Sequence, residues 1–265
     1  MVDFVCLGGK KCGTTWLYNQ LSKNKNLNPS KIKEPNYFGN ELKNSEWYES
    51  LWDKDRKGLK FECSARYIYD KKSVQNIIND FPNCKFILLI RKHLERSISH
   101  YYLLNRNNNT KNFESFLEDN YNSIIDKSLI YPQIKTLEDI GILNKTLILD
   151  FDKINKKPKE VFSKLEEFLG VKLKFFEDVD KGRGYIPRNK TLEKIKYSTS
   201  EFIIKRLSIS PKSFFLFRFI DRLYKLLLTK KMPENIYIKK ILIEKYNDLF
   251  SEDKKKLKEI YNIEI

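Results

Sequence analysis

The first apolar run of the chain leads into a glycine- and lysine-rich loop and then into a helical pattern. Apolar residues dominate positions 2–7, glycines follow at positions 8 and 9, and apolar residues recur at helical spacing from Thr14 onward. These patterns predict a buried strand, a tight turn and a helix. The N–H groups and the positive dipole end of a helix N-terminus favour an anion, so the loop predicts a phosphate site.

Further strands and helices are expected to alternate along the chain. Apolar runs without polar alternation are typical of buried parallel strands, and apolar residues at helical spacing indicate helices. The strands are expected at 60–64, 84–90 and 147–151, and the helices at 73–81, 94–104, 113–125, 131–137 and 159–169. The passage 26–38 is expected to be turn-rich, and the aromatic cluster 47–52 to belong to the core or a pocket wall. This alternation predicts an α/β fold, with a central parallel sheet flanked by helices and ligands at the carboxyl ends of the strands.

The chain is expected to form a single domain over residues 1–265. An α/β core would occupy 1–190, and a helical C-terminal extension at 191–265 would pack on it. The segment 214–228 is apolar but interrupted by charged residues. Such a helix more often packs on its own domain or on a partner, and peripheral contact with a membrane surface is the alternative.

The formal net charge of +16 points to an anionic partner, such as nucleic acid, a membrane surface, an acidic polymer or a multiply charged cosubstrate. Solvated surface lysines are the alternative explanation, since Lys, Asn and Ile are abundant throughout. No segment approaches the roughly 18 uncharged apolar residues of a membrane span, and no cleavable signal pattern is visible. We therefore expect a soluble, cytoplasmic protein.

The cysteines and histidines argue against a zinc site. The 4 cysteines form no C-x-x-C pair, and the chain contains only 2 histidines, His93 and His100. We expect reduced thiols and no bound metal.

The loop also departs from the P-loop of nucleoside triphosphatases, G-x-x-x-x-G-K-S/T. Gly8 and Gly13 keep the four-residue gap, but Thr14 stands where the lysine belongs, and the cations lie upstream at Lys10 and Lys11. Lysine-dependent binding of a magnesium triphosphate is therefore disfavoured.

Basic residues in three separate segments are expected at the same edge of the sheet: the loop 8–15, Arg91 with Ser99 eight residues later, and the segment 181–183. Together these segments resemble the sulfotransferase family, which transfers a sulfuryl group from 3′-phosphoadenosine 5′-phosphosulfate (PAPS) to a hydroxyl or amine. GGKKCGTTWL resembles the 5′-phosphosulfate loop, usually K-S/T-G-T-T, with Lys11 on its lysine. RKHLERSISHYY is similar to the 3′-phosphate segment, and KGRGYIP to the late loop that covers the nucleotide in the carbohydrate branch.

Three further segments extend the resemblance over about residues 3–188. KEPNYF at 33–38 resembles the segment of the carbohydrate branch that holds the catalytic glutamate, and ECSARY at 62–67 resembles its E-K-S-x-x-Y. The stretch from Asp150 resembles a structural segment of the family. Cys12 stands where a serine is common, and Cys63 replaces a lysine that faces the acceptor in relatives acting on heparan-type sugars, which speaks against a glycosaminoglycan acceptor.

The resemblance implies a P-loop-like, three-layer fold and a metal-independent sulfuryl transfer. Lys11, with backbone N–H groups of the loop, would stabilise the leaving phosphate, and Glu34 would be the general base. The acceptor would be a carbohydrate, or else a lipid or a small hydroxylated metabolite. Lys33, Glu62 and Ser64 would be substrate contacts. The nucleotide contacts would be Lys11, Cys12, Gly13, Thr14, Thr15, Trp16, Arg91, Ser99, Lys181, Gly182 and Arg183.

Several alternatives stay open at this point. Without the resemblance, Glu34 is better explained as a surface carboxylate paired with a lysine, and Trp16 is more often a core residue than a platform for adenine. The whole chain is alternatively a P-loop nucleotide kinase or NTPase, which the missing G-K-S/T disfavours. It is alternatively a basic module that binds nucleic acid, although its aromatic residues lie in apolar periodic segments rather than among basic ones, so we expect no nucleic-acid partner.

Overall fold

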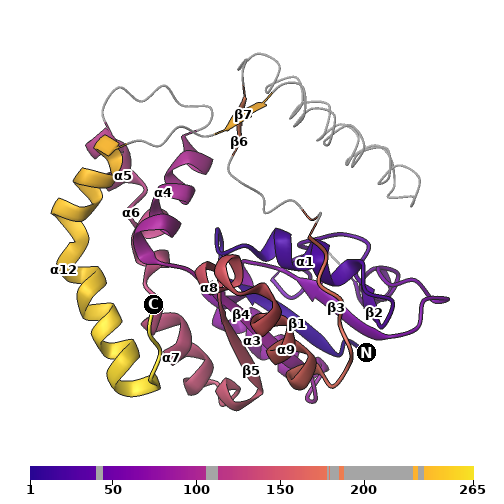
Figure 1. Ribbon diagram of the computed structural model, residues 1–265. Helices are drawn as coiled ribbons and strands as arrows, with labels where there is room; N and C mark the ends of the chain where they lie inside the picture. The colour runs from indigo at the N-terminus through magenta and orange to yellow at the C-terminus, as the bar shows by residue number, and fades with distance from the viewer. Residues whose placement is uncertain (40–43, 106–112, 178, 180–184, 188–228, 232–235) are drawn as a thin grey trace.

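A five-stranded parallel sheet forms the centre of the protein in the computed structural model, which describes residues 1–39, 44–105, 113–177, 179, 185–187, 229–231 and 236–265 (Figure 1). The strand order is β2-β3-β1-β4-β5, and each neighbouring pair is parallel. All five strands therefore end at one edge of the sheet. They are β1 (Phe4–Gly8), β2 (Leu27–Pro29), β3 (Leu59–Cys63), β4 (Lys85–Ile90) and β5 (Thr146–Asp150).

Helices connect the strands and cover both faces of the sheet (Figure 1). The described helices are α1 (Thr14–Ser22), α2 (Ser45–Glu49), α3 (Lys71–Asp80), α4 (His93–Leu104), α5 (Phe113–Asp119), α6 (Tyr121–Ile124), α7 (Tyr131–Asp139), α8 (Phe151–Lys156), α9 (Pro158–Leu169) and α12 (Ile236–Tyr261). Short 3₁₀ turns occur at η1 (Tyr67–Tyr69), η2 (Asp126–Ser128) and η3 (Leu143–Lys145).

The core consists of two layers of apolar side chains, one on each face of the sheet. Successive side chains of a strand point to opposite faces. In β1, Phe4 and Cys6 accordingly pack with residues of α1 and α9, and Val5 and Leu7 pack with residues of α3 and α7. This arrangement confirms the predicted three-layer α/β fold with a central parallel sheet.

Two local expectations need correction in part. The passage 26–38 consists of turns, bends and irregular backbone as expected, except for the three-residue strand β2. The apolar pattern misses β2 because its polar residue Asn28 is buried, where its amide Nδ2 donates to the carbonyls of Asp53 and Arg56 at 2.8 Å each. The helix expected at 113–125 is divided into α5 and α6 at Asn120, whose side-chain amide donates to the Phe116 carbonyl at 2.9 Å. Such side-chain bonds to the backbone compete with regular structure.

Towards the C-terminus, β6 (Tyr185–Pro187) and β7 (Thr229–Lys231) form an antiparallel pair, so β7 is a strand where only helices were expected. The long helix α12 is helical as predicted and contacts α4 and α7 (Figure 1). The expected helix at 214–228 lies outside the described residues. No helix in the described ranges is long and apolar enough to cross a membrane.

Candidate active site

The loop between β1 and α1 lies at the carboxyl edge of the sheet. Its Gly9 N–H donates to the Leu89 carbonyl of β4 at 2.7 Å. Gly13 is the N-cap of α1 and has a left-handed conformation (φ 91°), and a Cβ at this position would lie 2.1 Å from the Phe151 ring. Because a glycine has no side chain, none at the N-cap covers the first N–H groups of α1. These N–H groups suit an anion such as the one that the sequence leads us to expect at this loop.

Two arginines hold consecutive carbonyl groups of this loop. Arg91, which follows β4, donates from Nη1 to the Lys11 carbonyl at 3.1 Å. Arg96, on α4, donates from Nε to the Lys10 carbonyl at 3.1 Å. The expected meeting of the loop with Arg91 is therefore present in the structure, and Arg96 is a loop contact that the sequence analysis missed.

Both arginines keep a buried donor that no described residue accepts: Nε of Arg91 and Nη2 of Arg96. The Arg91 guanidinium lies 5.5 Å from the centre of the Phe151 ring, and Arg96 is only 1% exposed. A buried donor without a partner costs free energy. An anionic ligand within reach of these two atoms would satisfy donors for which the described residues offer no partner.

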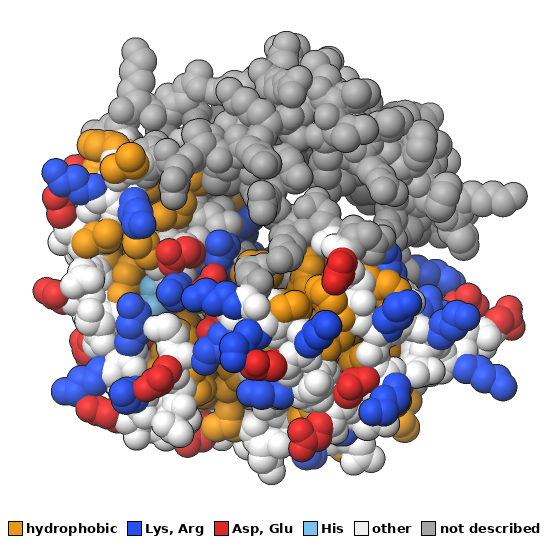
Figure 2. All heavy atoms as spheres, in the orientation of Figure 1, with side chains coloured by type: hydrophobic (Ala, Val, Ile, Leu, Met, Phe, Trp, Pro, Cys, Tyr) orange, Lys and Arg blue, Asp and Glu red, His pale blue; other side chains and the backbone are white. Residues whose placement is uncertain are grey.

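The loop region is strongly electropositive. Burial, together with the positive charges of Arg66, Lys127 and Arg96, lowers the pKa of Lys10. Burial lowers the pKa of His100 to about 3, and the positive charges of Arg96, Lys10 and other cations add to this effect. The imidazole is therefore neutral at physiological pH. Such a concentration of positive charge attracts anions. On the face of the described residues that Figure 2 shows, Lys and Arg are interspersed with Asp and Glu.

The remaining expected nucleotide contacts have different positions. Thr14 is buried and Thr15 exposed in the first turn of α1, and Cys12 is buried in the loop, where burial raises the pKa of its thiol to about 12. Ser99 is half-buried on α4, one turn after Arg96. Lys181, Gly182 and Arg183 lie outside the described residues.

Trp16 requires a correction. Its indole is 2% exposed and packs against Phe151, Phe162 and Phe175, with ring centres 6.5, 6.3 and 6.4 Å away. The aromatic residues around it bury the ring in the core, so Trp16 offers no open face to adenine. The alternative interpretation, a core residue in the first turn of α1, is the one that the structure favours.

Glu34 lies beside the carboxyl end of β3. Its N–H donates to the Cys63 carbonyl at 2.9 Å, and Lys33 Nζ forms an ion pair with its Oε1. The Glu34 side chain is 38% exposed, so the carboxylate is open to solvent. The negative charge of Glu34 acts to raise the pKa of Lys10, opposite to the effect of the neighbouring cations. Glu34 therefore lies within electrostatic reach of the loop.

Glu62 and Ser64 also require a correction, because both are fully buried behind the Glu34 segment. Glu62 accepts from the hydroxyls of Tyr48 at 2.7 Å and Ser64 at 2.6 Å. Ser64 Oγ in turn accepts from the Asn36 N–H at 3.2 Å. Burial and the Glu62 charge raise the pKa of Tyr48 well above its ordinary value. These residues brace the segment that carries Glu34 and do not face an acceptor.

We expect Gly13→Ala to destabilise the protein and to weaken anion binding at the loop. The substitution places a methyl group against the Phe151 ring at a positive φ, which should cost on the order of 2 kcal/mol or more. Gly141→Ala is the matched control, because Gly141 also has a positive φ (79°) but no atom within 4 Å of its Cβ position. Thermal unfolding curves of both variants give the comparison. Equal losses would mean that the Phe151 contact is unimportant.

In the described part of the chain, no three His, Cys, Asp or Glu side chains are arranged to hold a metal ion. The described groups at this edge of the sheet include cations, backbone N–H groups and the Glu34 carboxylate. This set can bind an anionic nucleotide and accept a proton from a second substrate.

A bacterial sulfotransferase structure, from Alicyclobacillus acidocaldarius, superposes with a TM-score of 0.58 at 19% identity, over 77% of this chain and 93% of its own. A mouse sulfotransferase complexed with PAP gives a TM-score of 0.47 at 18% identity, over 73% and 65%. The membrane-associated sulfotransferase kil1 of Dictyostelium discoideum is 30% identical over 105 residues, which are 38% of this chain but only 22% of that protein.

The sequence model of the sulfotransferase domain matches residues 2–213, which include the loop, Glu34, Arg91 and Ser99. This match covers most of the chain, and the bacterial structure shares its fold. The resemblance noted in the sequence is thereby confirmed, and the chain belongs to the sulfotransferase family.

Proposed function

We propose that this protein transfers a sulfuryl group from PAPS to a hydroxyl or amine of an acceptor. The observation that carries the proposal is a pair of buried donors that have no partner among the described residues, on the two arginines that hold the loop before α1. A nucleotide with a phosphosulfate at one end and a 3′-phosphate at the other offers acceptors both for the arginine donors and for the N–H groups at the start of α1. Membership in the sulfotransferase family supports the same cosubstrate.

The loop residues would bind the phosphosulfate end and stabilise the leaving phosphate. Negative charge builds on the bridging oxygen as the sulfur–oxygen bond breaks, and fixed cations and N–H dipoles aimed there lower the barrier. We assign this role to Lys11 and to the N–H groups of Gly13, Thr14 and Thr15. Because the sulfuryl group itself carries little charge, these groups would suffice without a metal.

Arg91 and Ser99 would hold the 3′-phosphate of the nucleotide. Arg91 lies at the end of β4, where its Nη1 holds the loop and its Nε has no described partner. One guanidinium thus fixes the loop and keeps a donor for the ligand. The Phe151 ring packs against both Gly13 and the Arg91 guanidinium.

Glu34 would accept the proton of the attacking hydroxyl or amine. Its carboxylate is exposed, while the buried Glu62 and Ser64 fix the segment behind it. Lys33, paired with Glu34, would orient the carboxylate and contact the acceptor. A general base of this kind contributes about 10²- to 10⁴-fold in rate.

We propose a carbohydrate as the acceptor, with a lipid or a small hydroxylated metabolite as alternatives. The likeness of residues 33–38 and 62–67 to the carbohydrate branch supports this choice. Cys63, at the position of an acceptor-facing lysine in heparan-type relatives, is fully buried, and burial raises the pKa of its thiol. This supports an acceptor other than a glycosaminoglycan. A cytoplasmic location and membrane contact through 214–228 stay predictions.

Calorimetric titration with 3′,5′-adenosine bisphosphate tests the proposed binding site for the PAPS nucleotide. We expect metal-independent binding that Arg91→Ala weakens by about tenfold to a hundredfold, because a charge-assisted hydrogen bond contributes about 1.5–3 kcal/mol. Lys92→Ala is the control, since this adjacent lysine is exposed. Binding of magnesium ATP without binding of the bisphosphate would replace the proposal with a nucleotide kinase or NTPase.

A further inference from the structure

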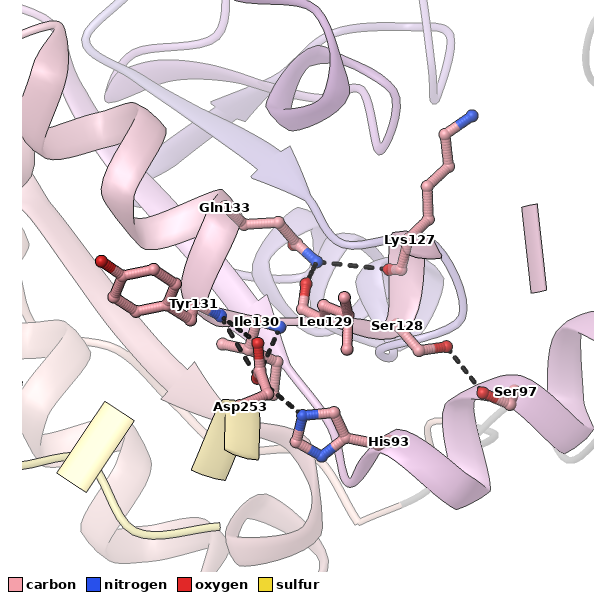
Figure 3. A network of polar contacts seen from close by, with 9 residues as sticks. All are labelled: His93, Ser97, Lys127, Ser128, Leu129, Ile130, Tyr131, Gln133 and Asp253. Atoms are coloured by element: carbon pink, nitrogen blue, oxygen red, sulfur yellow. Dashed lines mark hydrogen bonds and ion pairs between the residues drawn. The ribbon is translucent and has the colours of Figure 1, made fainter. Parts of the chain in front are cut away.

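Asp253 of α12 is a buried carboxylate that joins α12 to two other elements, α4 and the N-terminus of α7 (Figure 3). Its Oδ2 lies 2.7 Å from His93 Nε2 on α4 and accepts from the Ile130 N–H at 3.0 Å. Its Oδ1 accepts from the Tyr131 N–H at 3.1 Å. The side chains of Asp253 and His93 are 5% and 1% exposed. Burying a carboxylate is costly unless it is fully bonded, so this set of partners is specific.

At the N-terminus of α7, Asp253 takes the place of a capping side chain. Ile130, the N-cap residue, has no side chain that can accept a hydrogen bond, and Asp253 supplies the missing acceptor from another helix. A carboxylate at this position also interacts favourably with the helix dipole. Within α7, Gln133 Nε2 donates to the carbonyls of Lys127 and Leu129 at 3.2 and 2.6 Å, which secures the preceding turn.

That turn continues to the phosphate loop through Ser128 and Arg96. Ser128 Oγ accepts from Arg96 Nη1 at 3.1 Å and lies 2.7 Å from Ser97 Oγ. Arg96 Nε then donates to the Lys10 carbonyl. Polar contacts, joined between Ser128 and Ile130 by the backbone, therefore connect α12 to the loop.

The contact of Asp253 with α4 leads to Arg91. His93 begins α4 only two residues after Arg91. Its ring is held by Asp253 on one atom and packs against Phe250, also on α12, with ring centres 5.1 Å apart. Fixing the first turn of α4 in this way fixes the end of β4, where the Arg91 guanidinium meets the loop.

We infer that Asp253 is a positioning residue for the nucleotide site, acting through His93 on Arg91 and through the 128–131 turn on Arg96. The inference rests on the proposed function. It assigns a role to α12, which lies beyond the residues 2–213 that match the sulfotransferase domain. The C-terminal helix thus helps to prepare the site for the PAPS nucleotide.

Titration with 3′,5′-adenosine bisphosphate, at a temperature where circular dichroism shows each variant folded, tests this inference. We expect Asp253→Ala to weaken binding by roughly ten- to thirtyfold. Glu252→Gln, the neighbouring exposed carboxylate paired with Lys256, should leave the affinity unchanged. In an Arg91→Ala background the loss caused by Asp253→Ala should shrink to about threefold or less, since coupled residues are not additive. A merely structural role predicts the full loss in both backgrounds.

Histidine variants give the same readout if Asp253→Ala does not fold. His93→Ala should lower the affinity, and His93→Gln, whose amide Nε2 can donate to Asp253, should restore most of it. Wild-type affinity in Asp253→Asn and His93→Ala, or full additivity with Arg91→Ala, would overturn the inference. Failure of the wild-type protein to bind the bisphosphate would instead overturn the proposed function, so the two failures are distinguishable.

Discussion

Glu34→Gln is expected to lower the turnover number for sulfuryl transfer by about 10²- to 10⁴-fold, because the amide cannot accept the acceptor's proton. The substitution preserves the shape of a side chain that is 38% exposed. The hydrogen bond from the Glu34 N–H to the Cys63 carbonyl involves only the backbone and should persist. Binding of 3′,5′-adenosine bisphosphate should therefore stay within about twofold of wild type, since the change acts on the chemical step.

Glu160→Gln is the matched control for this prediction. Glu160 is an exposed carboxylate on α9 that pairs with Lys157 at 2.9 Å, in the way that Glu34 pairs with Lys33. Exposed pairs of this kind contribute little to stability, so Glu160→Gln should retain full activity. Equal rates for Glu34→Gln and Glu160→Gln, measured with labelled PAPS and an accepted substrate, would show that Glu34 is only a surface ion pair.

The first strand, the loop and the first helix were predictable because their signals are local. An unbroken apolar run, two adjacent glycines and helical spacing after Thr14 lie next to one another in the chain. The same holds for β4 and the arginine that follows it. Parallel strands then bring the two segments together at one edge, as the contact between Arg91 and the Lys11 carbonyl shows.

Arg96 was missed because polar residues in an amphipathic helix are normally assigned to the solvent face. In α4, however, His93, Arg96, Ser97 and His100 recur at helical spacing and are all buried. Polar side chains so placed need partners from other elements. The spacing was visible in the sequence, but the partners that make burial tolerable, such as Asp253 and Ser128, are 160 and 32 residues away.

The positions of Trp16 and Glu62 depended on contacts that no local pattern encodes. Trp16 is buried by aromatic residues of later segments, Phe162 and Phe175 among them. Glu62 is a charged residue inside the core, stabilised there by the hydroxyls of Tyr48 and Ser64. Tertiary partners distant in sequence therefore decide whether a polar or aromatic residue near the site contacts a ligand or supports the segment that does.

Lys11→Ala is expected to reduce sulfuryl transfer by about 10²- to 10³-fold, the loss typical when one donor that stabilises developing charge is removed. Lys11 has a left-handed backbone (φ 67°), held by the bond from Arg91 to its carbonyl. The bisphosphate should also bind more weakly, by about tenfold, since a charge-assisted contact to phosphate is lost. Single-turnover rates at saturating PAPS separate the effect on chemistry from the effect on binding.

Backbone strain must be distinguished from loss of the cation, because alanine is disfavoured at a positive φ whereas glycine is not. Lys11→Gly should therefore lose transfer as fully as Lys11→Ala, while Lys25→Ala, which removes an exposed lysine beyond the end of α1, should be fully active. Activity in Lys11→Gly near the wild-type level would mean that the backbone conformation, and not the ammonium group, accounts for the loss. The leaving phosphate would then depend on the N–H groups of Gly13, Thr14 and Thr15 alone.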